Sequence, residues 1–143
     1  MASLQVGVSV QHSYTVGAAV TAAALAERHA VPGLSLPAVW STPDMIAAME
    51  IACAALVADL LAPGQISVGV SNDVRHLAAT PVGIHVRVRA TLAEIEARKL
   101  TFAVEAHDSA EKVGEGTHVR YIVDRARFEA RVAEKRRTGT VTE

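Results

Sequence analysis

The segment 43–61 constrains the fold of this chain more than any other, because it is apolar on nearly every side of a helix. Thr42 supplies a hydroxyl of the kind preferred at an N-cap, and Pro43 suits the first helical position. Pro63 and Gly64 end the helix. A helix that is apolar all round has to be surrounded by protein. The sequence therefore predicts one long buried helix with the rest of the domain wrapped around it.

Glu50 is the one acidic residue in the interior of this predicted helix. A carboxylate in apolar surroundings must be paired, protonated or used in chemistry. The positions one turn away, 46, 47, 53 and 54, hold Ile, Ala, Cys and Ala, so the helix itself offers no partner. Glu50 is therefore the first candidate for a catalytic residue.

Most of the remaining chain has the patterns of strands and turns. The clearest strand covers 84–96, where aliphatic residues alternate with histidine, arginine and threonine. We expect further strands over 4–16, 66–77, 100–107 and 113–124, short helices over 18–29 and 128–137, and a loop over 30–38. The last four strands follow one another and predict a meander packed on the long helix. This order indicates an α+β fold.

Composition narrows the class of protein. At 143 residues the chain is expected to be a single domain, 1–143. The 14 basic and 15 acidic residues nearly cancel, so nothing favours nucleic acid or a membrane surface as a partner. No signal peptide or membrane span is apparent, and the single cysteine, Cys53, fits a reducing compartment. We therefore expect a cytoplasmic protein.

Three segments of the chain, 39–55 (VWSTPDMIAAMEIACAA), 67–81 and 106–118, carry a family resemblance. They resemble the fluoroacetyl-CoA thioesterase family, a branch of the hotdog-fold acyl-CoA thioesterases. The resemblance implies a hotdog fold, in which a curled antiparallel sheet wraps around one long central helix with a helical lid over about 18–38. The Thr- and Gly-rich tail, about 138–143, is expected to be frayed.

The same resemblance implies the positions of the site. The family's catalytic threonine, glutamate and histidine fall on Thr42, Glu50 and His76, and its backbone amide facing the thioester carbonyl falls on Gly69. In the lid, Leu36 takes a substrate-binding position where the family has phenylalanine. The resemblance thus implies an acyl-CoA thioesterase that removes a small acyl group from coenzyme A, without implying a preference for fluoroacetyl.

Within this family reading, Glu50 acts either as a nucleophile, through a transient anhydride, or as a general base on water. His76 moves protons, and Thr42 orients Glu50 or the substrate. No metal or redox cofactor is expected, since the six histidines have no metal-ligand spacing. The phosphates of coenzyme A have candidate partners in Arg87, Arg89, Arg98, Lys99, Arg120 and Arg125.

Two alternative functions stay open at this point. One is a hotdog module that binds acyl-CoA or another small ligand without turning it over. The other is a hotdog enoyl-CoA hydratase, which uses an aspartate and a histidine five residues apart, but here Asp44 is followed at that distance by Met49. His107 and His118 are expected to cap strand ends rather than to line the site.

The spacing of Thr42 and Glu50 bears on the oligomeric state. The two are eight residues apart, so on one continuous helix they are about 12 Å apart along the axis and about 80° around it. Their side chains cannot close that gap. Either the helix begins later than Thr42, or the two residues meet across a two-fold axis from different chains. Because hotdog proteins generally pair, we expect a homodimer with composite active sites.

Overall fold

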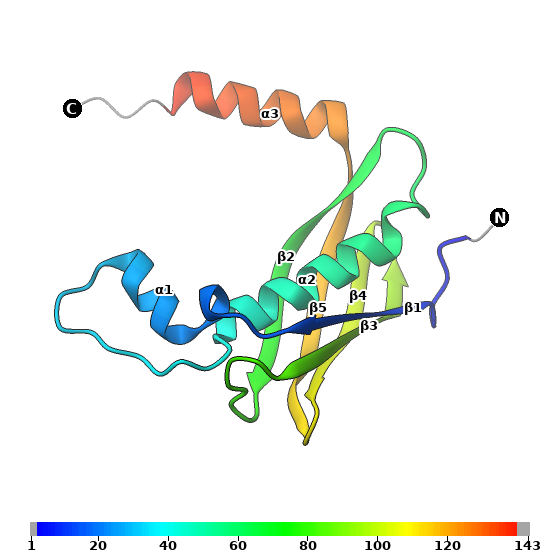
Figure 1. Cartoon of the computed structure of the whole chain (residues 1–143). Coiled ribbons are helices and arrows are strands. Elements are labelled where there is room, and N and C mark those ends of the chain that lie inside the picture. The colour runs from blue at the N-terminus through cyan, green and yellow to red at the C-terminus, as the bar shows by residue number, and fades with distance from the viewer. Residues whose placement is uncertain (1–2, 140–143) are drawn as a thin grey trace.

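The computed structural model describes residues 3–139 and shows one curled antiparallel sheet with a long helix across its inner side (Figure 1). The strands are β1 (Ser9–Thr15), β2 (Gln65–His76), β3 (His85–Glu96), β4 (Lys99–Asp108) and β5 (Lys112–Asp124). The helices are the 3-10 turn η1 (Ala18–Val20), α1 (Ala22–His29), α2 (Thr42–Ala58) and α3 (Arg125–Thr138). The predicted α+β fold with one central helix is confirmed.

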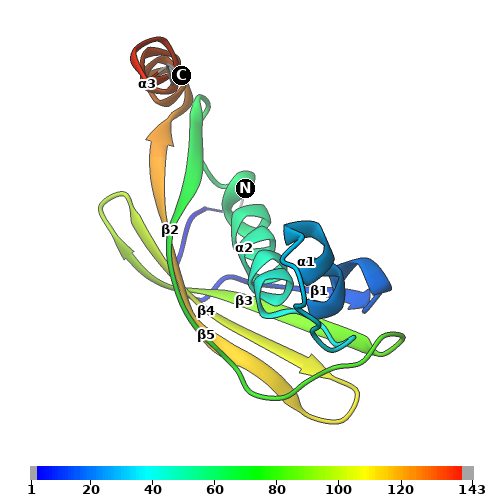
Figure 2. The ribbon, with the colours of Figure 1, turned by 90° about the vertical axis from the view of Figure 1, so that its left-hand side faces the viewer.

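The order of the strands in the sheet is β1-β3-β4-β5-β2. β3, β4 and β5 form a meander, but β2 lies at the far edge beside β5, so the predicted meander of four strands is wrong for β2. After β2 the chain crosses the end of the sheet (Figure 2), where the Leu77 N–H donates to Val113 and the Trp40 N–H to Thr80. Alternation of apolar and polar residues shows where a strand lies in the sequence. Which strand it pairs with depends on the path of the connecting chain.

The core lies between α2 and the sheet. α2 contributes Met45, Met49, Ala52, Cys53 and Val57, all fully buried. The sheet meets them with aliphatic and aromatic side chains of alternate positions, chiefly Val86, Val88, Ala90, Leu92, Leu100, Phe102, Val104 and Ala106. The other side of α2 is open, and Ile51 is 60% exposed. The prediction of a helix surrounded on every side is therefore wrong, because a single curled sheet covers only one side.

The start of α2 differs from the prediction by one residue. Ser41 is the N-cap, since its side chain accepts a hydrogen bond of 3.0 Å from the backbone N–H of Asp44. Thr42 is instead the first helical residue, followed by Pro43. Because Ser41 takes the capping role, the Thr42 hydroxyl is available for another contact. The helix ends at Ala58 rather than at residue 61, with Asp59 as its C-cap.

The other elements agree with the predicted ranges to within a few residues. β1 is shorter than the expected 4–16, and α3 starts three residues earlier than expected and has no buried residue. The predicted lid contains η1, α1 and an exposed irregular stretch over 31–38. Of the predicted frayed tail, Thr138 still belongs to α3, and 140–143 lie outside the described residues. Within residues 3–139, no helix is long and apolar enough to cross a membrane.

Two glycines of β5 explain the glycine-rich run 114–116. A side-chain carbon at Gly114 would collide with the sulfur of Met45, and one at Gly116 would collide with the backbone of Asp73. These glycines therefore let β5 approach α2 on one side and β2 on the other. Close packing therefore accounts for the run.

Candidate active site

Thr42 and His76 form the first of two polar clusters along α2. The Oγ1 atom of Thr42, at the start of α2, lies 2.7 Å from Nδ1 of His76, the last residue of β2. Burial lowers the pKa of His76, and the backbone of Ala78 acts weakly in the opposite direction. The neutral imidazole, which is the form able to accept a proton, is thereby favoured at neutral pH.

A hollow of about 410 Å³ opens beside this first cluster. It is lined by residues of the lid, the start of α2 and the end of β2, namely Ala22, Val39, Trp40, Ser41, Thr42, His76, Leu77, Ala78 and Ala79. The Nε2 atom of His76 is buried and has no hydrogen-bond partner within residues 3–139. The first cluster thus combines a hydroxyl, an unsatisfied imidazole nitrogen and space for a small group.

Glu50 belongs to the second cluster, and its partners come from the sheet. The Asn72 side-chain amide donates a hydrogen bond of 2.9 Å to Glu50 Oε1, and Nδ1 of His118 lies 3.8 Å from the same oxygen. The Glu50 side chain is 38% exposed. The expectation of a carboxylate isolated in a buried helix is therefore wrong, because α2 turns this residue toward polar groups of the paired strands β2 and β5 and leaves it partly exposed.

Behind Glu50, a buried histidine and an arginine are linked to each other. His118 is fully buried in the middle of β5, and its Nε2 lies 3.1 Å from Nη1 of Arg120. Arg120 also donates from Nε to the Ser67 hydroxyl at 2.8 Å and from Nη2 to the Ser67 carbonyl at 3.0 Å. The guanidinium is therefore held through all three of its nitrogens.

Gly69 faces this second cluster from β2. A side-chain carbon at this position would lie 3.2 Å from both Arg120 Nη1 and His118 Cε1, and 3.4 Å from Glu50 Oε1. The pairing of β2 with β5 shifts register between Gly69 and Ser71. Because the residue has no side chain, a guanidinium, an imidazole and a carboxylate can all come close to the same point of the backbone.

The two clusters are held apart by matching lengths of helix and strand. Eight residues of α2 separate Thr42 from Glu50, and four residues of β2 separate His76 from Asn72. Both separations amount to about 12–13 Å. Since α2 is continuous from Thr42 through Glu50, the possibility that the helix begins later is excluded. Within one chain, Thr42 and His76 therefore meet each other but not Glu50.

Three residues near Glu50 were missed or misjudged from the sequence. His118 was expected at a strand end, and that expectation is wrong, because it lies in the middle of β5. Asn72 was not singled out, and Arg120 was only one of six candidate phosphate partners. Their places depend on the pairing of β2 with β5, which no local pattern specifies. Leu36 lies in the exposed stretch 31–38, outside both clusters.

The described residues do not favour a cysteine nucleophile, a hydratase pair or a metal site. Burial raises the pKa of the Cys53 thiol to about 12, so this cysteine is unsuited to act as a nucleophile. Asp44 accepts a hydrogen bond from Ser41 and lies 4.0 Å from Arg28, while Met49 is fully buried, which leaves no hydratase pair. Residues 3–139 contain no group of three or more His, Cys, Asp or Glu side chains placed to hold a metal ion.

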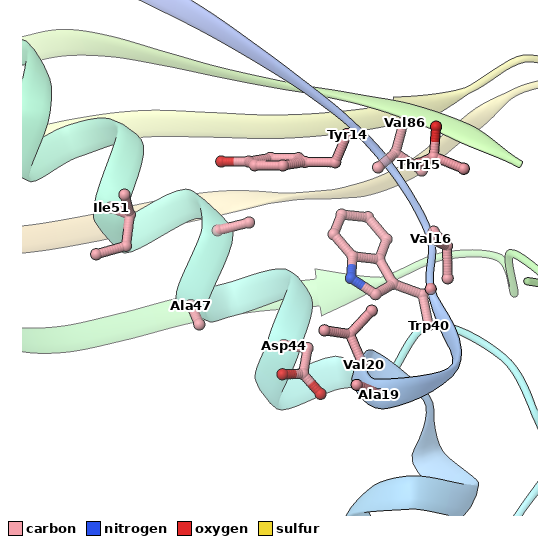
Figure 3. Close-up of a pocket in the computed structure, with 12 residues that line it drawn as sticks. Tyr14, Thr15, Val16, Ala19, Val20, Trp40, Asp44, Ala47, Ile51 and Val86 are labelled. Carbon is pink, nitrogen blue, oxygen red and sulfur yellow. The ribbon is translucent and has the colours of Figure 1, made fainter. Parts of the chain in front are cut away.

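A separate apolar cavity lies between α2, the end of β1 and Trp40 (Figure 3). Its volume is about 540 Å³, and Tyr14, Val20 and Ile51 are among its lining residues. Asp44 is its only charged lining residue. None of Thr42, Glu50, Gly69 and His76 lines it, so this cavity is distinct from both polar clusters.

Comparison with known proteins places the chain in a family. The family described as fluoroacetyl-CoA-specific thioesterase matches residues 20–126. The chain is 41% identical over 103 residues to the fluoroacetyl-CoA thioesterase of Streptantibioticus cattleyicolor, which covers 72% of this chain and 74% of that protein.

Solved structures agree with this match. A structure of the fluoroacetyl-CoA thioesterase FlK superposes with a TM-score of 0.86 at 36% identity, over 94% of this chain and 98% of that one. A hypothetical Thermus thermophilus protein, described as a thioesterase superfamily member, shares the fold with a TM-score of 0.83 at 24% identity, over 98% of this chain and 100% of that one. The chain therefore belongs to the fluoroacetyl-CoA thioesterase family and is a hotdog-fold thioester hydrolase that acts on acyl-CoA.

Proposed function

We propose that this enzyme hydrolyses a small acyl thioester of coenzyme A, and that Thr42, Glu50 and His76 carry out the reaction. The observation that supports this most strongly is the convergence of Glu50 and Arg120 on Gly69, since a side-chain carbon on this glycine would lie 3.4 Å from Glu50 Oε1 and 3.2 Å from Arg120 Nη1. A thioester carbonyl bound beside Gly69 has both a carboxylate and a cation within reach. Acyl transfer needs such a pair, one group to promote attack and one to stabilise the resulting negative charge.

Glu50 promotes attack on the carbonyl carbon in one of two ways. As a general base it removes a proton from water while the water oxygen bonds to the carbon. As a nucleophile its own oxygen bonds to the carbon, and water then cleaves the anhydride. In both cases the C–S bond breaks, and the coenzyme A thiolate leaves and takes up one proton. Neutral His76, paired with Thr42, is the group to which we assign the proton transfers.

Two donors are available for the carbonyl oxygen as it becomes negative. One is the backbone N–H of Gly69, to which the family resemblance gives this role, and the other is the Arg120 guanidinium, whose Nη1 would lie 3.2 Å from a side-chain carbon on Gly69. Loss of one such preorganised donor commonly costs about 10²–10³ in rate. Arg120 thereby acts at the acyl group rather than at the coenzyme A phosphates.

We further propose that the working enzyme is a homodimer joined through the free edge of β2. β2 has twelve residues and pairs with β5 on one side only, and residues 69–73 in its middle are exposed. An unpaired edge of this length is a template for another strand. A two-fold axis at Asp73 places His76 of one chain opposite Val70 of the second chain. That arrangement closes the gap between the two clusters.

The experiment that tests the proposed function is a panel of acyl-CoA thioesters of increasing chain length, assayed for release of the free thiol. Turnover of the smallest acyl groups is expected, and Glu50→Ala is the control. Binding of acyl-CoA without turnover of any thioester would instead support the binding-module alternative.

A further inference from the structure

His118 has only one arrangement of its ring proton that satisfies its neighbours. The Ser71 carbonyl, 2.9 Å from Nδ1, can only accept a hydrogen bond, so Nδ1 carries the proton. The Arg120 guanidinium, 3.1 Å from Nε2, can only donate, so Nε2 is the bare acceptor. The ring is thus neutral and its tautomer is fixed. It has no hydrogen-bonding atom left for the substrate.

The surroundings of His118 hold its ring in place. The side chain has no exposed surface, and the ring stacks on Phe102 with centroids 6.2 Å apart. Glu50 Oε1 is 3.8 Å from Nδ1, too far for a hydrogen bond. The Glu50 carboxylate is bonded by Asn72 instead. A ring fixed in this way offers Arg120 a rigid acceptor.

Resting on the proposed function, we propose that His118 is a positioning residue that acts through Arg120. Its bare Nε2 fixes Nη1 of Arg120 beside Gly69, where the carbonyl oxygen becomes negative. Ser67 holds the other edge of the same guanidinium through Nε and Nη2. Without the His118 acceptor, Arg120 keeps its charge and its bonds to Ser67, but Nη1 is no longer fixed. A misplacement of about 1 Å at such a group can cost about 10²-fold in rate.

A matched pair of substitutions separates this role from a merely structural one. Glutamine at position 118 places an acceptor oxygen near the position of Nε2, so His118→Gln keeps the bond to Arg120 and loses the bond to Ser71. Asparagine places an amide nitrogen near the position of Nδ1, so His118→Asn keeps the bond to Ser71 and loses the bond to Arg120. Both are buried, neutral and polar, and each removes one of the two hydrogen bonds.

The expected result is a larger loss in His118→Asn. Its kcat falls about 10- to 100-fold with KM changed less than about threefold, because the Arg120 contact matters most in the transition state. His118→Gln is expected to lose less than about fivefold in kcat. Thermal unfolding of both variants controls for folding. Equal losses, or a larger loss in His118→Gln, would overturn the proposal.

A second test substitutes the two residues that hold Arg120 together with Arg120 itself. Ser67→Ala removes the side-chain acceptor for Arg120 Nε and is expected to lower kcat in the same way as His118→Asn. In an Arg120→Gln background, His118→Asn and Ser67→Ala are each expected to have no further effect, since both act through one guanidinium. An additive loss there would contradict the proposal. Absence of thioester turnover in the unaltered protein would contradict the proposed function itself, which is a different outcome.

Discussion

The Thr42 hydroxyl lies 2.7 Å from Nδ1 of His76, although 34 residues separate the two in the chain. The contact joins the first residue of α2 to the last residue of β2. It forms because Ser41, not Thr42, caps the helix. Glu50 lies eight residues further along α2 with a different set of partners.

Glu50 and His76 are expected to be essential for turnover. Glu50→Gln removes the base or nucleophile while keeping the side-chain shape, and His76→Ala removes the proton carrier. Each is expected to lower kcat by at least about 10²-fold on the best acyl-CoA substrate. Thermal unfolding close to that of the unaltered protein serves as the control. Near-normal turnover in either variant would show that the assigned role of that residue is wrong.

Mixed dimers test the composite site. Thr42→Ala and Glu50→Ala chains are each expected to be inactive alone. A mixed dimer combines the intact Thr42 and His76 of one chain with the intact Glu50 of the other, which gives one working site. Random mixing in equal amounts makes half of the dimers mixed, each with one working site of two, and therefore restores about a quarter of the activity of the unaltered protein. A monomer in solution, or mixtures that regain nothing, would count against the composite geometry.

A cysteine at the proposed two-fold axis tests the same interface without kinetics. In an Asp73→Cys protein the two introduced thiols face each other across the axis, so oxidation is expected to give a covalent dimer on a non-reducing gel. The unaltered protein is the control, since its one cysteine, Cys53, is buried. An Asp73→Cys protein that stays monomeric on the gel after oxidation would argue against pairing through β2 at this register.

Gly69→Ala is expected to block the site without unfolding the protein. The added methyl lies 3.2 Å from Arg120 Nη1 and 3.4 Å from Glu50 Oε1, and so crowds the two groups between which we place the carbonyl. The backbone angle φ of Gly69 is not positive, so alanine causes no backbone strain there. We expect kcat/KM to fall at least about tenfold while the unfolding midpoint changes little. A matched substitution at Gly64, where φ is +83° and the space is open, should show the reverse pattern.

Stability is expected to fall as pH decreases from 7 to 5. Burial lowers the pKa of His76, and it also lowers the pKa of His118, where Arg120 adds to the effect while Ser71 and Glu50 oppose it. Below the ordinary histidine pKa of about 6.5, the unfolded chain therefore binds protons that the folded chain does not. Each histidine can contribute a slope of up to about 1.4 kcal/mol per pH unit until its folded pKa is reached.

Urea unfolding at pH 7, 6 and 5 measures this loss of stability. His118→Gln is expected to make the free energy of unfolding depend less steeply on pH.

Asp108 affects stability at lower pH than the histidines do. Burial raises its pKa, but hydrogen bonds from Ala110, Glu111 and Thr80 outweigh burial, so its net shift is downward. Its contribution is therefore lost below about pH 4, outside the histidine window. A free energy of unfolding that is constant between pH 7 and 5 would contradict the histidine prediction.

Local sequence was sufficient for several features. The apolar run with its Ser-Thr-Pro start predicted α2, and the alternation of small aliphatic and charged residues predicted β3 almost to the residue. The resemblance to the family identified the fold and the thioesterase class. Glu50 stood out because no residue on its own helix could pair with it. All of these rest on contacts or patterns within a short stretch of chain.

Tertiary structure alone decided which side chains meet. The place of β2 beside β5 brings Asn72, His118 and Arg120 to the neighbourhood of Glu50, whereas the predicted meander placed β2 beside β3. Because Ser41 caps α2, the hydroxyl of Thr42 is available for its contact with His76. The spacing of apolar residues shows which face of a helix or strand is buried. It does not show which other helix or strand packs or pairs with that element. Which residues form the site therefore depends on the crossover after β2, where pairing and close packing of distant segments select one arrangement.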